Sequence, residues 1–383
     1  GGVPERLTFH PSGGTVLDWT PDGQHVVFAS NRTAPLFTSE LYTVPAAGGP
    51  VTAVPVDRGS LASYAPDGSA IHASASDLGR RTLWRMPLTG DAPERVTDMG
   101  TVTAFEAHEK GLLFARDSLG SPTELFWLPA GGDEPRQVTD FSGPQLDDVA
   151  LGAYEQFSFT GAGGATVYGY VVKPAQFEEG ETYPVAFLIH GGPQGSFGDH
   201  FHYRWNPQTY AGQGFAAVMI DFHGSIGYGQ AFTDSISGDW GGKPLEDLKL
   251  GLAAAVEKYD FLDGDRVCAL GASYGGFMIN WIAGQWPDRF RCLVNHDGVF
   301  DQRSMYYTTE ELWFPEWDQR GTPFGNPENY ERFNPAAHVD KWRAPMLVVH
   351  GELDYRVPVT QGIAAFTALQ RRGIESRFLY FPD

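Results

Sequence analysis

The chain has 383 residues, of which 42% are hydrophobic, and its formal net charge is −20, from 27 basic and 47 acidic residues. This length allows two or three domains with packed cores. A surface of that charge repels nucleic-acid backbones and anionic membranes, so we expect neither as a partner. The longest apolar runs, such as YPVAFLI and FAAVMI, fall well below the roughly 20 residues that a membrane span requires. We expect a soluble protein. The sequence leaves open its compartment, cytoplasmic or periplasmic or secreted, and whether it forms a homo-oligomer.

The first part of the chain contains a repeat. TPDGQHVVFAS at residues 20–30 recurs as APDGSAIHASAS at 65–76, and a weaker copy, HEKGLLFARDS, stands at 108–118. A further pair of short apolar runs follows each copy, and Asp-Gly and Gly-Gly pairs between such runs indicate β-hairpins. A repeat of about 45 residues with four short strands is typical of a β-propeller blade, while an ordinary antiparallel sandwich is the alternative. We therefore predict a partial propeller of about three blades over residues 1–144, with further blades missing from the chain.

The pattern changes at residues 145–383. Short, fully apolar runs occur at 185–189, 216–220, 266–270, 291–295 and 345–349, and they alternate with helical stretches such as 245–259. Continuous apolar runs are expected of parallel strands that are buried on both faces. We predict an α/β hydrolase domain with a doubly wound, mostly parallel sheet, whose chemistry lies in the loops beyond the carboxyl ends of its strands.

The first of these loops is HGGP, residues 190–193, which follows the run at 185–189. A glycine pair allows backbone N–H groups to approach a developing oxyanion without obstruction by side chains. A glycine-rich turn capped by His190 is the alternative. We predict that the N–H groups of Gly192 and of Tyr274, the residue after the nucleophile discussed next, form an oxyanion hole.

The second loop is Gly271-Ala272-Ser273-Tyr274-Gly275, which joins the run at 266–270 to a helical stretch. A G-x-S-x-G sequence between a buried strand and a helix is the context of a nucleophile elbow. The flanking glycines are needed there because a Cβ at either position would crowd the helix or the strand. We predict Ser273 as a catalytic nucleophile.

A third loop, HGELDYRVP at residues 350–358, follows the run at 345–349. In this fold the carboxylate that orients the catalytic base follows a late strand, after the serine in chain order. Asp354 is our choice for that carboxylate, and Asp297, which follows the run at 291–295, is its rival. The two cysteines, Cys268 and Cys292, lie in apolar runs and are interpreted as unpaired, buried core thiols, with a disulfide between them as the alternative. Because no zinc-type spacing of Cys and His occurs, we expect no metal.

Residues from about 145 to 383 resemble the catalytic domain of the prolyl oligopeptidase family, particularly its acylaminoacyl-peptidase and bacterial dipeptidyl-peptidase branches. The matching stretches are HGGPQGSFGD, DFHGSIGYGQ, GDWGGKPLEDL, GASYGGFMINW and HGELDYRVPVTQG. The resemblance implies a propeller before the hydrolase domain, Ser273 as nucleophile, Asp354 as the acid of the triad and no cofactor. His223 departs from it, since many relatives carry arginine at that position.

The resemblance also implies where the catalytic base lies. In the family the histidine stands in a segment resembling FPDENHW, a little over thirty residues past the acid, whereas this chain reads FLYFPD up to Asp383. We therefore expect the chain to lack its catalytic histidine. His190, His223, His296 and His350 are interpreted as residues that shape loops or form hydrogen bonds in the core.

The predicted function is that of a serine peptidase that acts on short peptides and removes N-terminal dipeptides or acylated amino acids. A densely aromatic stretch, MYYTTEELWFPEW at 305–317, is a candidate substrate pocket in which Tyr306, Trp313 and Phe314 line an apolar wall and Glu310 and Glu311 bind a free amine. Core packing with surface charge is the other interpretation of that stretch. An esterase of the same fold and a catalytically silent, propeller-based binding protein are the alternative functions.

Overall fold

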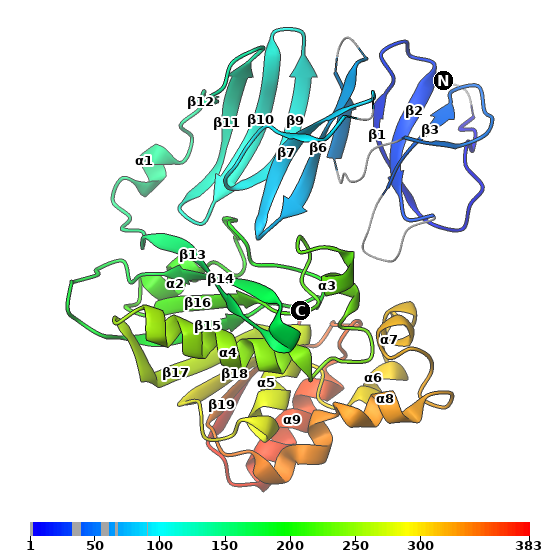
Figure 1. Ribbon diagram of the computed structural model, residues 1–383. Helices are drawn as coiled ribbons and strands as arrows, with labels where there is room; N and C mark the ends of the chain where they lie inside the picture. The colour runs from blue at the N-terminus through cyan, green and yellow to red at the C-terminus, as the bar shows by residue number, and fades with distance from the viewer. Residues whose placement is uncertain (1–2, 33–39, 55–60, 66–67, 90) are drawn as a thin grey trace. The chain divides into compact units, whose positions relative to one another are not determined.

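The computed structural model describes residues 3–32, 40–54, 61–65, 68–89 and 91–383 (Figure 1). The chain forms two compact units. The first comprises Gly1–Val149 together with Asp199–Tyr203, and the second comprises Ala150–Gly198 together with Arg204–Asp383.

The first unit is built from antiparallel strands that follow one another in sets of four within the described residues. The first set is a sheet of its own, and the second and third are joined by one parallel pairing, Arg81 with Thr101. This confirms the sheet-rich fold predicted for the N-terminal part. The strands are β1 (Gly14–Trp19), β2 (His25–Ser30), β3 (Glu40–Pro45), β4 (Thr52–Ala53), β5 (Leu61–Tyr64), β6 (Ala70–Asp77), β7 (Arg80–Pro87), β8 (Glu94–Arg95), β9 (Thr101–His108), β10 (Gly111–Ser118), β11 (Ser121–Pro129) and β12 (Arg136–Gln137).

Glycines at the repeated position of each set allow the tight turns between strands. Gly23 and Gly68 have φ angles of 66° and 71°, a region that side chains with a Cβ rarely adopt. At Gly111 an added Cβ would lie 2.1 Å from the carbonyl oxygen of Leu128. The second predicted Asp-Gly turn is described only at its glycine, because Asp67 lies outside the described residues.

The apolar clusters of the first unit lie mainly between neighbouring sets of strands. Leu41 of the first set packs in one cluster with Ile71 and Met86 of the second. Leu83 of the second set packs in another with Phe114 of the third. A single set cannot bury both of its faces alone, so stacking of the repeats supplies the core.

Residues 199–203 belong to the first unit although they lie within the hydrolase sequence. The Asp199 carboxylate accepts hydrogen bonds from the N–H groups of Gly100 and Leu119, each at 2.9 Å. His200 pairs with the buried Asp117 at 2.8 Å between Nδ1 and Oδ1. These charged and polar contacts fix the segment to the loops of β9 to β11.

The second unit contains a sheet in the order β13-β14-β16-β15-β17-β18-β19-β20. β13 and β14 pair antiparallel at one end, and the pairings from β16 through β20 are parallel. This confirms the predicted α/β hydrolase fold class. The strands are β13 (Tyr154–Thr160), β14 (Thr166–Val172), β15 (Tyr183–Ile189), β16 (Ala216–Asp221), β17 (Leu262–Ala272), β18 (Cys292–His296), β19 (Met346–Gly351) and β20 (Ser376–Phe381).

Helices α2, α4, α5 and α9 pack against this sheet. α4 carries a proline in its first turn, Glu246 near its N-terminus and Lys258 in its last turn, an order of charges that suits the helix dipole. α5 is buried along almost its whole length, which matches its apolar sequence. The helices are α1 (Gly143–Leu146), α2 (Pro207–Ala211), α3 (Gln230–Asp234), α4 (Lys243–Lys258), α5 (Tyr274–Gln285), α6 (Gln302–Tyr306), α7 (Trp313–Asp318), α8 (Pro327–Arg332) and α9 (Thr360–Arg371), with short 3₁₀ turns η1 (Ala162–Gly164) and η2 (Pro335–Lys341).

The two cysteines correct one expectation. Cys268 and Cys292 form a disulfide, so their interpretation as unpaired thiols is wrong. The reason is the strand order: β17 and β18 are neighbours whose register places these two residues directly opposite each other, with Cα atoms 4.7 Å apart. The bond crosslinks the strand that leads to Ser273.

The described part of the chain contains no helix that could span a membrane. None of its helices combines the length and the apolar character that crossing a bilayer requires.

Candidate active site

Ser273 is the single residue between β17 and α5. Its φ and ψ angles are 58° and −117°, a strained conformation for a residue with a Cβ. A Cβ on Gly275 would lie 2.2 Å from the carbonyl oxygen of Ile189, and one on Gly271 would lie 2.5 Å from the backbone of Gly275. The turn is therefore as tight as the sequence pattern predicts, and it leaves Ser273 partly exposed.

The HGGP loop lies directly against this turn. A Cβ on Gly191 would be 3.3 Å from the Cβ of Ser273, and the next residue, Gly192, is exposed with φ of 123°. Among the described residues, the backbone N–H groups of Gly192 and Tyr274 donate no hydrogen bond to protein. Two free donors beside the serine are what an oxyanion hole requires.

Several internal contacts hold the HGGP loop in place. His190 shares a hydrogen bond of 2.9 Å with the buried Ser225 hydroxyl. Asp221, at the end of β16, accepts hydrogen bonds from Ser196 at 2.6 Å and from Tyr228 at 2.5 Å. Burial raises the pKa of Asp221, although His190 and these two hydroxyl groups oppose the rise.

Asp354 lies in the loop after β19. Its Oδ1 accepts hydrogen bonds from the N–H groups of Arg356 and Val357, at 3.0 and 2.9 Å. The side chain is 22% exposed, and its Oδ2 lies 3.9 Å from His350 Nε2. The carboxylate is thus oriented by the backbone and keeps one oxygen for a further partner.

Asp297, the rival acid, lies in the neighbouring loop after β18. It has φ of 48°, and its Oδ2 is 2.9 Å from His296 Nε2. Burial raises its pKa, but the hydrogen bond and charge of His296, with the charge of His350, outweigh burial and hold the pKa below its ordinary value. The two acids face the same histidine, since Oδ1 of Asp297 is 3.9 Å from His350 Nε2.

The strand ends bring these loops to one edge of the sheet. The N–H of Ser273 donates to the carbonyl of His296 at 3.0 Å, and the N–H of Asp297 donates to that of Val349 at 2.9 Å. The carboxyl ends of β17, β18 and β19 therefore meet beside Ser273, and Asp354 leaves the last of the three.

A carboxylate and imidazole cluster of Asp297, His350 and Asp354 has ligand-type atoms within 4.8 Å of one another. The Nε2 atom of His350 that faces the two acids is also 2.7 Å from the carbonyl oxygen of Val357. A carbonyl oxygen only accepts hydrogen bonds, so this nitrogen carries the proton and is a donor. Nε2 donates to Val357, and both acids are 3.9 Å from it, so the three side chains lie close together without hydrogen bonds between them.

The histidines near the strand ends all have partners. His190 contacts Ser225, His223 contacts the buried Asp247, His296 contacts Asp297, and His350 contacts Val357. Within the described residues, the hydroxyl of Ser273 forms no hydrogen bond. No described histidine thus acts on the Ser273 hydroxyl in this conformation.

Only some residues of the aromatic stretch 305–317 contact the loops at the carboxyl ends of the strands. Glu310 and Glu311 both contact Arg356, at 3.6 and 2.8 Å, in the loop that carries Asp354. The ring of Phe314 contacts that of Trp240, which in turn contacts Tyr274. These contacts bring two acids and one aromatic ring toward the serine loop.

The other two residues of that stretch lie differently. Tyr306 is buried, and its hydroxyl donates to Glu316 at 2.8 Å while its ring packs on Tyr330. Trp313 is 50% exposed and packs on Phe314. Tyr306 is therefore part of the packing between α6 and α8, whereas the side chain of Trp313 is half-exposed.

Three residues that the sequence analysis did not select connect the two loops of the site. The buried Asp318 accepts hydrogen bonds from Gln194 Nε2 at 3.1 Å and from Trp240 Nε1 at 2.8 Å. The carbonyl of Trp240 accepts from the hydroxyl of Tyr274 at 2.6 Å. The GDWGG stretch that supported the family resemblance was the one available signal for Trp240; Asp318 directly follows the aromatic stretch at 305–317 and was left out of it.

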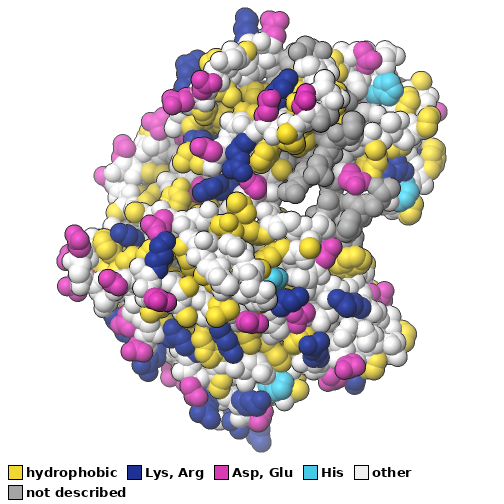
Figure 2. All heavy atoms as spheres, viewed as in Figure 1, with side chains coloured by type: hydrophobic (Ala, Val, Ile, Leu, Met, Phe, Trp, Pro, Cys, Tyr) yellow, Lys and Arg dark blue, Asp and Glu magenta, His cyan; other side chains and the backbone are white. Residues whose placement is uncertain are grey.

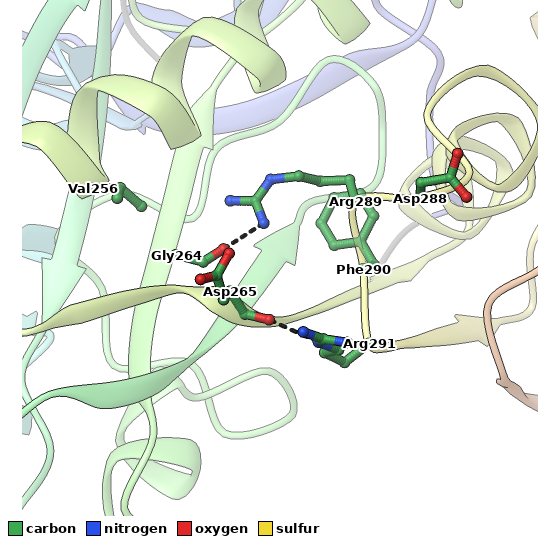
Figure 3. A pocket seen from close by; sticks show the side chains of 7 residues that line it. All are labelled: Val256, Gly264, Asp265, Asp288, Arg289, Phe290 and Arg291. Carbon is green, nitrogen blue, oxygen red and sulfur yellow. Dashed lines mark hydrogen bonds between the residues drawn. The ribbon is translucent and has the colours of Figure 1, made fainter.

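A separate pocket of about 530 Å³ lies at the opposite edge of the sheet, at the start of β17 (Figure 3). Two of its arginines donate to backbone carbonyl groups, Arg289 to Gly264 at 2.6 Å and Arg291 to Asp265 at 2.8 Å. None of its lining residues was a candidate of the sequence analysis. On the face in Figure 2, acidic and basic side chains are interspersed, so the net charge does not gather there in one patch.

Comparison with known proteins identifies the family. The model of the prolyl oligopeptidase family matches residues 201–383. The hydrolase unit belongs to the prolyl oligopeptidase family. Dipeptidyl-peptidase 5 of Schizosaccharomyces pombe is 50% identical over 232 residues, which are 60% of this chain and 34% of that protein. Dipeptidyl-peptidase 5 of Aspergillus fumigatus is 37% identical over 329 residues, 84% of this chain and 45% of that protein.

The fold extends the similarity to both units. The structure of Pyrococcus horikoshii acylaminoacyl peptidase superposes with a TM-score of 0.83 at 23% identity, covering 97% of this chain and 58% of that one. The chain spans less than half the length of the two dipeptidyl-peptidases. The prolyl oligopeptidase assignment and the α/β hydrolase fold with a sheet-rich N-terminal part thus agree with the sequence analysis.

Proposed function

We propose that this protein is a serine peptidase that hydrolyses short peptides through an acyl-enzyme on Ser273 and removes N-terminal dipeptides or acylated amino acids. The observation that carries the proposal is the strained Ser273 at a strand-to-helix turn, beside a glycine loop with free N–H groups. The dipeptidyl-peptidase 5 relatives, at 37% and 50% identity, support peptide substrates.

In the proposed mechanism the Oγ of Ser273 attacks the scissile carbonyl carbon and transfers its proton to a histidine base. The carbonyl oxygen becomes an oxyanion that accepts hydrogen bonds from the N–H groups of Gly192 and Tyr274. The base then donates the proton to the leaving amine, and water hydrolyses the acyl-enzyme by the same steps. Asp354 orients the imidazole through the carboxylate oxygen that the backbone leaves free.

We place the base on a segment C-terminal to β20. The topology supports this, because β20 pairs parallel with β19, up to Phe381 opposite Gly351, and the N–H of Glu352 donates to the carbonyl of Phe381 at 2.7 Å. A chain that leaves β20 therefore starts at the same edge as Asp354. A histidine on it would complete the Ser, Asp, His order of this fold.

Substrate selection follows from the residues beside Asp354. Glu310 is 53% exposed and Glu311 is 22% exposed, and both share Arg356 as a partner. A free N-terminal ammonium group would compete for these carboxylates, while Trp313 and Phe314 would contact an apolar side chain. An acylated substrate would gain only the second kind of contact.

The test compares hydrolysis of two substrate sets by the full-length protein. Chromogenic dipeptide substrates with a free amine are measured beside the same substrates with an acetylated amine, and Ser273→Ala is measured with both. We expect turnover of at least one set, abolished by Ser273→Ala, and a loss of preference for free amines in Glu310→Gln with Glu311→Gln. Turnover of simple esters alone would indicate an esterase, and turnover of nothing would indicate a silent binding protein.

A further inference from the structure

We propose that Asp318 is a positioning residue that sets the oxyanion hole, because its carboxylate joins the side chain of Gln194, the residue directly after the HGGP loop, to Trp240 and, through it, to Tyr274. This inference rests on the proposed function, since it concerns the two N–H groups assigned there to the oxyanion. Asp318 touches neither substrate nor Ser273 and acts through the loops that it connects.

The first hydrogen bond of Asp318 supports the HGGP loop. Gln194 stands two residues after Gly192, and its Nε2 donates to Asp318 Oδ1 at 3.1 Å. Gly192 has φ of 123°, a backbone conformation that is soft in a glycine and needs support from its neighbours. The backbone around it is also held on the far side, where Ile226 N–H donates to the carbonyl of Gly195 at 3.1 Å. Asp318 thus holds the side chain of a residue two positions after the proposed donor.

The second hydrogen bond of Asp318, from Trp240, supports the first turn of α5. Trp240 Nε1 donates to Asp318 Oδ2 at 2.8 Å, and the Tyr274 hydroxyl donates to the Trp240 carbonyl at 2.6 Å. The rings of Trp240 and Tyr274 also meet edge to face, with centroids 5.2 Å apart. Tyr274 carries the second proposed N–H donor, so one buried carboxylate spans both halves of the oxyanion hole.

The chemistry of the contact explains why an acid serves here. Asp318 is fully buried at the end of α7, and its two oxygens each receive one N–H donor. Burial raises the pKa of Asp318 to about 7, against the lowering effect of Trp240 and Gln194. Among the described residues, the Oε1 atom of Gln194 is buried without a partner. The amide can therefore turn over and accept a hydrogen bond if its partner becomes a donor.

This last feature separates a positioning role from mere packing. In Asp318→Asn the side-chain oxygen can still accept from Trp240, and the new NH₂ group can donate to Gln194 Oε1 after the amide turns over. In Asp318→Ala both contacts are lost. We expect Asp318→Ala and Gln194→Ala each to lower kcat by about 10- to 100-fold with KM changed less than about 3-fold, as loop displacement by an ångström does. Asp318→Asn is expected to stay within about 3-fold of wild type.

The experiment measures kcat, KM and the rate of Ser273 labelling by a fluorophosphonate in the full-length protein and its variants. The double variant Asp318→Ala with Gln194→Ala should lose no more than the larger single loss, because both changes break one connection. Asp239→Ala is the matched control, because Asp239 is the carboxylate next to Trp240 in the chain. Asp239 accepts a hydrogen bond from the N–H of Lys243 at 3.2 Å and does not contact Gln194. Its labelling rate should equal that of wild type.

The outcomes are distinguishable. A wild-type protein that is not labelled, or a Ser273→Ala variant that retains turnover, defeats the proposed function and this inference with it. If the wild type is labelled, and Gln194→Ala and Asp318→Ala show the kcat and labelling rate of the wild type, this overturns the positioning role alone. So does an Asp318→Asn variant as slow as Asp318→Ala, or an Asp239→Ala control that slows equally. Gln194 is only partly buried, so its variant keeps the test available if Asp318→Ala fails to fold.

Discussion

At the scale of single residues, the site depends on buried carboxylates whose hydrogen bonds come from neighbouring loops. Asp247 accepts from the N–H groups of Ala162 and His223, both at 2.7 Å, and Asp221 and Asp318 are held in the same way. An unpaired buried carboxylate would be strongly unfavourable, so each of these acids specifies the position of its donors. The loops around Ser273 are thereby fixed by charge as well as by packing.

Asp318 makes the stability of the protein depend on pH. Its pKa rises from 3.8 to about 7 in the folded protein, so between about pH 4 and pH 7 the native state holds a proton that the unfolded state has released. The free energy of unfolding must then fall as pH rises through this window, by at most about 1.4 kcal/mol per pH unit from this group. Asp318→Asn lacks the titration. Urea unfolding of both proteins at several pH values should show the free energy of unfolding of the wild type falling relative to that of Asp318→Asn as pH rises from about 4 to about 7. A difference that stays constant over this range would contradict the raised pKa.

At the scale of elements, the turn between β17 and α5 leaves no space for a side chain at its glycines. Gly275→Ala would place a methyl group 2.2 Å from the carbonyl oxygen of Ile189. Overpacking of this kind costs about 1–3 kcal/mol, and it would move α5 away from β15. We expect Gly275→Ala to lower the free energy of unfolding by that amount and the labelling rate of Ser273 at least about 10-fold. Both are measured on one preparation.

The control for that variant is Gly212→Ala. Gly212 has an ordinary helical φ of −63°, and an added Cβ would be 3.4 Å from the carbonyl oxygen of Gln208, which is a normal contact. It should leave the labelling rate unchanged. Equal labelling by the Gly275 variant would mean that the turn tolerates displacement and is not the strained element described above.

The elements that were predicted from the sequence share one property: their signal is local. The apolar runs at 185–189 and 266–270 became β15 and β17, and the glycine pattern placed Ser273 between strand and helix. What was missed depends on contacts between distant segments. Cys268 and Cys292 are opposite each other only because β17 and β18 are neighbours. Asp318 meets Gln194 from 124 positions away in the chain, which no pattern of spacing reveals.

At the scale of the whole molecule, the chain combines a sheet-rich unit and a hydrolase unit that are connected more than once. Asp199–Tyr203 belong to the first unit, in which Asp199 and His200 bind residues of the strand-rich part. From Arg204 onward the chain belongs to the hydrolase unit again. This crossing begins at Asp199, six residues after Pro193 of the HGGP loop. The repeated Asp-Gly and Gly-Gly turn sequences predicted the strands of the first unit. No local sequence pattern indicated that Asp199–Tyr203 also belongs to that unit.

The location of the base is the proposal that concerns the chain as a whole. A form of the protein extended through the histidine expected after Asp383 should hydrolyse peptides, while a form ending at Asp383 should be slower by on the order of 10⁶-fold, because a neutral serine hydroxyl is a poor nucleophile. Steady-state hydrolysis of one peptide by both forms is the measurement. Comparable turnover would instead point to a described histidine, first of all His296, whose side chain is 31% exposed and paired with Asp297.

The central claim, that Ser273 is the nucleophile of an acyl-transfer site, is tested most directly by locating a covalent adduct. The full-length protein is treated with a fluorophosphonate, digested and analysed by mass spectrometry, beside Ser273→Ala and a heat-unfolded sample. The account predicts one adduct, on the peptide that contains Gly271 to Gly275 at Ser273, absent from both controls and accompanied by loss of peptide hydrolysis. An adduct on another residue with Ser273 unmodified, or hydrolysis that persists after Ser273 is fully labelled, would contradict it.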